Sequence, residues 1–90
     1  DHLNITLFGK VQGVFLRRTI KHQAHRLGIH GFVRNEADST VYIEAEGDTN
    51  ALEQFSIWLK QGAGEGDYDI VDVLIEDGNV KNFEEFEIQE

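Results

Sequence analysis

The chain has 90 residues, the size of one small domain, so we expect residues 1–90 to fold as a single unit. Its 17 acidic and 8 basic side chains give a formal net charge of −9, which argues against binding to nucleic acid or to an anionic membrane. The absence of cysteine excludes disulfides and thiolate chemistry, and no apolar run is long enough to span a bilayer, so we expect a cytoplasmic protein.

The first third of the chain predicts a strand, a glycine-containing loop and a helix. Apolar and polar residues alternate over positions 3–7, which is typical of a half-buried strand. Gly9 and Gly13 then interrupt this pattern. Apolar residues recur at helical spacing over positions 16–27, and Gly28 is well placed to terminate the helix.

The remaining two thirds predict three longer strands, a second helix and a short closing strand. Residues 29–34 and 41–45 favour two strands joined by a turn over residues 35–40. Asp48 is a good N-cap for a helix with an apolar stripe through residue 59. After a glycine-rich loop, the last strands are expected at residues 68–76 and, following a turn at residues 77–78, around Phe83, Phe86 and Ile88.

This order is β-α-β-β-α-β with a short C-terminal strand. Two helices of about three turns cannot cover both faces of such a sheet, so they should pack side by side on one face. The predicted fold is therefore an α+β, ferredoxin-like two-layer sandwich with a mixed, mainly antiparallel sheet.

Charge is distributed unevenly along the chain. Positions 2–35 contain no acidic residue but carry six basic ones: Lys10, Arg17, Arg18, Lys21, Arg26 and Arg34. One interpretation is a helix that uses basic side chains for solubility. The other is a local site for a small anion, set in an acidic body that repels large polyanions. The many acids after Asn35 are interpreted as a solvated surface.

The loop that leads into the first helix is the best candidate for such an anion site. Residues 9–17 run from a strand end through two glycines into a helix start. Backbone N–H groups in such a turn, together with the helix N-terminus, can surround a tetrahedral anion. Arg17, in the first helical turn, could add a two-pronged guanidinium contact. A plain tight turn remains the alternative reading of this segment.

Two signatures in the sequence resemble those of the acylphosphatase family. The first, Gly-x-Val-Gln-Gly-Val-x-Phe-Arg, is matched at Gly9, Val11, Gln12, Gly13, Val14 and Arg17, with Leu16 in place of the usual aromatic residue. The second, Gly-aromatic-Val-Arg-Asn-x-x-Asp-Gly-x-Val, is matched at Gly31, Phe32, Val33, Arg34, Asn35, Asp38 and Val41, with Ser39 in place of glycine. The resemblance extends over essentially the whole chain.

The resemblance implies hydrolysis of acyl phosphates, the mixed anhydrides of a carboxylic acid and phosphate, to a carboxylate and inorganic phosphate. The implied phosphate-binding loop is Gln12, Gly13, Val14, Phe15, Leu16 and Arg17. Arg17 would bind the phosphoryl oxygens and Asn35 would position the attacking water. Because the carboxylate is a good leaving group, positioning and charge stabilisation suffice, and no metal or cofactor is expected.

Further expectations concern partners and alternatives. A small-molecule acyl phosphate is the expected substrate, inorganic phosphate a product inhibitor, and the protein a monomer that binds neither nucleic acid nor membrane. The alternative function is a phosphate- or anion-binding accessory domain without turnover; an RNA-binding module of the same fold class is disfavoured by acids flanking Tyr42. His22 and His25 have a spacing that can hold a metal, but they are expected to face solvent.

Overall fold

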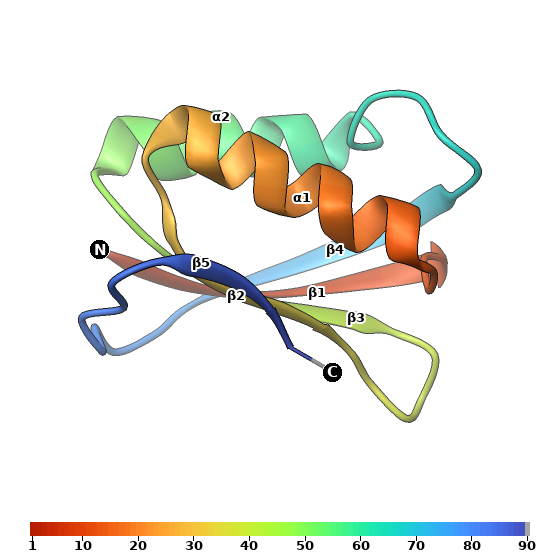
Figure 1. Ribbon diagram of the computed structural model, residues 1–90, viewed down its shortest axis with the longest axis horizontal. Coiled ribbons are helices and arrows are strands. Elements are labelled where there is room, and N and C mark those ends of the chain that lie inside the picture. Colours follow the sequence, from red (N-terminus) through yellow and green to blue (C-terminus); the bar gives the residue numbers. More distant parts are fainter. Residues whose placement is uncertain (90) are drawn as a thin grey trace.

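The structure is a computed structural model that describes residues 1–89, with Val14 described by its backbone alone. Five strands and two helices follow one another in the predicted order (Figure 1). They are β1 (His2–Lys10), α1 (Val14–Leu27), β2 (His30–Asn35), β3 (Val41–Glu46), α2 (Thr49–Lys60), β4 (Asp69–Asp77) and β5 (Phe86–Gln89).

The strands form one sheet in the order β4-β1-β3-β2-β5. β1 lies antiparallel to β3 and β4, and β2 lies antiparallel to β3 but parallel to β5. The register places Ile43 of β3 opposite both Ile5 of β1 and Val33 of β2. Because side chains alternate between the two faces of a strand, this register lines up the apolar residues on one face.

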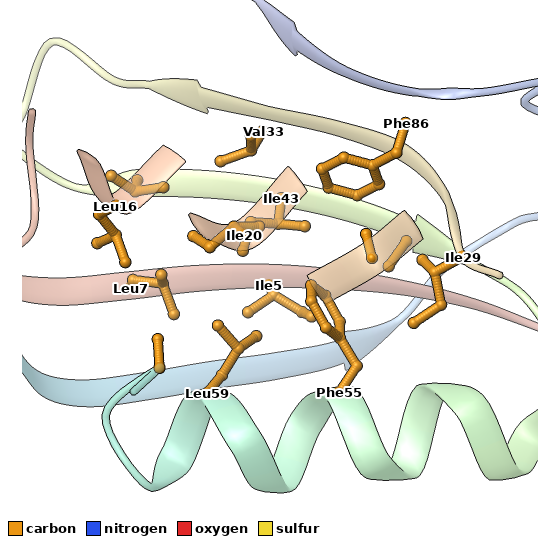
Figure 2. Packing of buried hydrophobic residues seen from close by; sticks show 14 of the residues in the cluster. Ile5, Leu7, Leu16, Ile20, Ile29, Val33, Ile43, Phe55, Leu59 and Phe86 are labelled. Atoms are coloured by element: carbon orange, nitrogen blue, oxygen red, sulfur yellow. The ribbon is translucent and has the colours of Figure 1, made fainter. Parts of the chain in front are cut away.

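Both helices cover that apolar face, which confirms the predicted two-layer sandwich (Figure 1). Leu16 and Ile20 of α1 and Phe55 and Leu59 of α2 are at most 1% exposed and point into one apolar layer with the sheet residues (Figure 2). Burial of these side chains supplies most of the driving force for folding. None of the helices within residues 1–89 is long and apolar enough to cross a membrane.

Local signals set the ends of both helices as the sequence predicts. Gly28 ends α1 in the left-handed conformation, with φ 70° and ψ 29°, and its N–H closes the last turn. Asp48 begins α2 with its side-chain Oδ1 accepting a hydrogen bond from the Ala51 N–H at 2.8 Å.

The prediction that the acids after Asn35 are simply a solvated surface is wrong for Glu44 and Glu46. These two side chains lie on the sheet face opposite the helices, yet the residues are only 6% and 8% exposed. The β4–β5 connection covers them, and Lys81 reaches Glu44 Oε1 with its Nζ at 2.8 Å. The carboxylate of Glu46 accepts the backbone N–H groups of Lys81 and Phe83. Burial is tolerated because these acceptors are satisfied.

The closing strand is also shorter than predicted, because it begins at Phe86 and excludes Phe83. The Phe83 N–H donates a hydrogen bond to Glu46 Oε1 at 2.9 Å, and the centre of the Phe83 ring lies 5.7 Å from that of Phe32. Pairing with β2 begins only after the Glu85 carbonyl has accepted the Gly31 N–H at 2.8 Å. Phe83 therefore covers the sheet rather than extending it.

Candidate active site

The connection between β1 and α1 is shaped by two glycines. The β1–β4 register shifts between Phe8 and Gly9, and a Cβ at Gly9 would collide with the Asp69 carbonyl oxygen. This bulge turns the chain away from the sheet. Gly13 precedes α1 with φ 148° and ψ 157°, a conformation that side chains rarely adopt.

The N-terminus of α1 therefore stands at the end of a glycine-shaped loop. Its first backbone N–H groups have no acceptor within the helix. The first turn contains no acidic residue that could neutralise the positive end of the helix dipole. Such an end is suited to an anionic ligand.

Arg17 adds a buried cation close to this helix end. The residue is only 8% exposed, and its Nη1 donates a weak hydrogen bond to the Gln89 carbonyl at 3.4 Å. Within residues 1–89 its buried Nε has no hydrogen-bond partner. A buried donor without an acceptor is costly. The guanidinium is thus held in place with capacity to bind an acceptor.

Asn35 is the last residue of β2 and lies near the same end of the sheet. Gln89, which accepts from Arg17, is opposite Arg34 in the β2–β5 register, one residue before Asn35. Asn35 is exposed, and it shares the helix-covered face with Val33, two residues earlier. The topology thus brings the ends that carry Arg17 and Asn35 to one corner of the fold.

Arg34, next to Asn35, makes its contacts on the sheet face that the helices do not cover. Its guanidinium carbon lies 5.3 Å from the ring centre of Phe32 and 5.2 Å from that of Tyr42. Its Nε donates to Glu36 Oε1 at 2.6 Å, and this hydrogen bond raises the pKa of Arg34 above its usual value. Arg34 is therefore a sheet-face residue rather than a second cation of the candidate site.

Gln12 links the loop to the turn that follows Asn35. Its Nε2 donates to the carbonyl oxygens of Glu36 at 2.6 Å and Thr40 at 3.1 Å. These two contacts place the β1–α1 connection directly beside the β2–β3 turn. They bring together the two signature segments, which are separated in sequence by 24 and 28 residues at these contacts.

The other predicted loop residues have different environments. Phe15 is 70% exposed at the start of α1, whereas Leu16 is 1% exposed and fills the core where the family signature has an aromatic residue. The side chain of Val14 lies outside the described part of the structure, which shows only that α1 begins at this residue. Leu16 can contribute to an anion site only through its backbone.

Sequence reasoning missed two groups of contacts. The partners of Gln12 are backbone carbonyls, and no sequence pattern predicts such contacts. The contact between Arg17 and the Gln89 carbonyl is unpredictable for the same reason. His22 and His25 are exposed as predicted. Among residues 1–89, no three histidine, aspartate or glutamate side chains lie close enough together to hold a metal ion.

The structure is a ferredoxin-like α+β sandwich with the buried Arg17 guanidinium near the N-terminus of α1, and comparison with known proteins identifies its family. The family model described as Acylphosphatase matches residues 3–88. A relative named Acylphosphatase from Thiobacillus denitrificans is 33% identical over 82 residues, covering 91% of this chain and 92% of the relative. The chain belongs to the acylphosphatase family.

Two further similarities agree with this assignment. An acylphosphatase from Ligilactobacillus salivarius is 52% identical over 56 residues, and the match spans 62% of this chain and 62% of that relative. The crystal structure of acylphosphatase from Bacillus subtilis superposes with a TM-score of 0.90 at 29% identity, covering 99% of this chain and 98% of that one.

Proposed function

We propose that this protein hydrolyses acyl phosphates to a carboxylate and inorganic phosphate. The observation that carries the proposal is the buried Arg17 guanidinium, whose Nε has no partner within residues 1–89, at an α1 N-terminus free of acidic residues. Membership of the acylphosphatase family supports the same reaction.

In this mechanism the phosphoryl group binds at the start of α1. The backbone N–H groups of the loop and the guanidinium of Arg17 surround its oxygens, and they neutralise the charge that builds up in the transition state. Because this charge stabilisation comes from the chain itself, the reaction is proposed to need neither a metal nor a cofactor. Arg17 suits the task because its planar fork matches phosphate geometry.

Asn35 is proposed to hold the attacking water in line with the bond that breaks. The water oxygen forms a bond to phosphorus as the bond between phosphorus and the carboxyl oxygen breaks. The bonding electrons leave with the carboxylate, and both water protons remain on the phosphate product. The amide oxygen of Asn35 can accept a hydrogen bond from this water and so hold the water in position for attack.

The proposal also covers the location of the protein, its oligomeric state and its inhibition. We propose a cytoplasmic monomer that takes a small-molecule acyl phosphate and is inhibited by its product, inorganic phosphate. A phosphate that binds the same loop and the same guanidinium as the substrate must compete with it.

The experiment is hydrolysis of benzoyl phosphate, a simple aryl acyl phosphate, with and without EDTA. We expect turnover well above the uncatalysed rate and unchanged by the chelator. Loss of activity in EDTA would overturn the metal-free mechanism. Absence of turnover, combined with binding of inorganic phosphate, would show instead an accessory domain that binds anions.

A further inference from the structure

We infer that Gln12 is a positioning residue: it fixes the phosphate-binding side of the proposed site relative to the water-binding side. The inference rests on the proposed function and deepens it, because the family signature alone places Gln12 in the loop without saying what its side chain does. The structure gives that side chain two partners, both on the turn after Asn35.

These contacts need a side chain with two N–H donors, which the Gln12 amide supplies. Both partners of Gln12 are backbone carbonyl oxygens, of Glu36 and Thr40, so only a group with two N–H donors can satisfy them together. The Gln12 NH₂ does so at 2.6 and 3.1 Å, so one contact is slightly shorter than the usual N–H···O range and the other lies within it. A side chain of the same length without donors would bond to neither carbonyl, and the side-chain link between the loop and the turn would be lost.

The turn on the other side of the link is itself held by hydrogen bonds. The Glu36 N–H donates to the Thr40 carbonyl at 2.9 Å, and the Ser39 N–H donates to the Glu36 carbonyl at 3.3 Å. Asp38 Oδ1 accepts from the Thr40 N–H at 3.1 Å, and its contacts with Thr40 lower the pKa of Asp38. Gln12 is therefore hydrogen-bonded to a turn that is closed by its own hydrogen bonds and that begins at Glu36, the residue after Asn35.

The two halves of the proposed site lie on opposite sides of this link. Arg17 and the first N–H groups of α1 follow Gln12 along the chain and bind the phosphoryl group, whereas Asn35 precedes that turn and holds the water. The link therefore controls the distance between water and phosphorus without touching either. A displacement of about 1 Å between reacting groups can lower a rate about 10²-fold.

This position predicts how the loss of the link divides between binding and rate. Phosphate is held by groups on one side only, so its affinity should survive. The alignment of water with phosphorus depends on both sides, so kcat should fall. A residue that bound the phosphate directly would instead weaken phosphate binding.

The experiment is a double-mutant cycle with benzoyl phosphate as substrate and inorganic phosphate as the binding probe. Gln12→Met removes both donors at nearly unchanged size, and Gln12→Glu is the second variant, which keeps the shape but offers a carboxylate to two carbonyls. Gln54→Met, at an exposed position of α2, is the matched control. Each substitution is made in the native protein and in Asn35→Ala, and folding is verified by urea unfolding.

We expect Gln12→Met to lower kcat about 10-fold or more while KM and the Kd for phosphate stay within about threefold. In the Asn35→Ala background the same change should lower kcat by less than about threefold, because the effect of Gln12 passes through Asn35. Gln12→Glu should be at least as impaired as Gln12→Met, and Gln54→Met should match the native protein.

Three results would overturn the inference. One is native kcat in folded Gln12→Met; another is an equal drop in both backgrounds; the third is phosphate binding weakened about tenfold or more, which would make Gln12 a phosphate ligand. A native protein without turnover would overturn the proposed function itself, and the inference with it, so the two failures are distinguishable.

Discussion

At the scale of single residues, Arg17 is the clearest departure from what stability alone would select. A buried guanidinium with one weak contact to Gln89 and an Nε without a partner among residues 1–89 is a cost to folding. An unsatisfied buried donor costs about 1–3 kcal/mol. The same cost becomes an advantage when an anion arrives, because the donor is already desolvated and oriented.

The proposed roles of Arg17 and Asn35 differ in what their removal changes. Arg17 contacts the phosphoryl group before and during reaction, so Arg17→Ala should raise KM and lower kcat together. Asn35 holds water, which contributes little to substrate affinity, so Asn35→Ala should lower kcat about 10²-fold or more with KM within a few-fold. Steady-state kinetics on benzoyl phosphate measures both.

Controls for this pair exclude loss of structure. Asn35→Ala should keep the native unfolding midpoint and bind inorganic phosphate, and Asn35→Asp should be impaired further, because a carboxylate repels the phosphoryl group. Native kcat in folded Asn35→Ala would refute the water-positioning role and leave the reaction to Arg17 and the loop N–H groups.

Ser39 carries a backbone conformation that suits glycine. Its φ is 75°, in the left-handed region, at the position where the family signature has glycine. Because a Cβ makes this conformation unfavourable, we expect Ser39→Gly to stabilise the protein by up to about 1 kcal/mol. Urea unfolding measures the change. Ser56→Gly, inside α2, is the matched control, and it should destabilise by about 0.5 kcal/mol because glycine has a lower helix propensity than serine. An unchanged or lowered midpoint for Ser39→Gly contradicts the prediction.

At the scale of secondary structure, local signals were predictable and distant contacts were not. Each of these local signals lies within a few residues of the structure that it determines: the alternation in β1, the Asp48 cap and the Gly28 terminus. The burial of Glu46 depends on Lys81, 35 residues away, so no local pattern marks it. In the site, Arg17 was recognisable through the signature, whereas by charge alone it resembles any solvating residue of a basic helix.

Glu46 joins the β4–β5 connection to the sheet by accepting two of its backbone N–H groups. Burial alone would raise the pKa of Glu46, but hydrogen bonds from the Lys81 N–H, from His2 and from the Phe83 N–H outweigh it and lower the pKa to about 2. A carboxyl whose pKa is depressed in the folded state stabilises the fold above its ordinary pKa of 4.5. That contribution is lost as the pH falls toward 2.

We therefore expect Glu46→Gln to lower the free energy of unfolding at pH 7 by about 1–3 kcal/mol. The deficit relative to the native protein should shrink steadily between about pH 5 and pH 2, where the native carboxyl itself becomes protonated. Urea unfolding at each pH measures it, with the exposed Glu53→Gln as control, which should stay within about 0.5 kcal/mol of native. A deficit that does not vary with pH would show that the lost contacts are not those of a carboxylate.

At the scale of the whole molecule, the distribution of charge restricts the size of the anion that can bind. The chain carries a net charge of −9, yet positions 2–35, which include the β1–α1 loop, Arg17 and Asn35, contain no acidic residue. The edge strand β4 alone presents Asp69, Asp72, Glu76 and Asp77. A small dianion at the N-terminus of α1 would lie near Arg17 and a first helical turn without acidic residues, whereas a polyanion would extend over the acidic remainder of the surface.

The last prediction tests the site through the stability of the entire fold. A ligand that binds only the native state stabilises it, by about 1.4 kcal/mol at a free concentration ten times its Kd. For a domain of this size each kcal/mol raises the Tm by about 4–8 °C. Inorganic phosphate should therefore raise the Tm by several degrees, as measured by circular dichroism.

Two other effects of phosphate must be separated from site binding. Phosphate strengthens apolar burial in any protein, and salt screens the mutual repulsion of the acidic side chains. Chloride at equal ionic strength measures the screening. Arg17→Ala measures both general effects together, because it keeps almost all of the surface but lacks the buried guanidinium. The increase in Tm that remains after subtraction of the Arg17→Ala value is due to binding at the site. Equal increases in the two proteins would show that phosphate does not bind at Arg17.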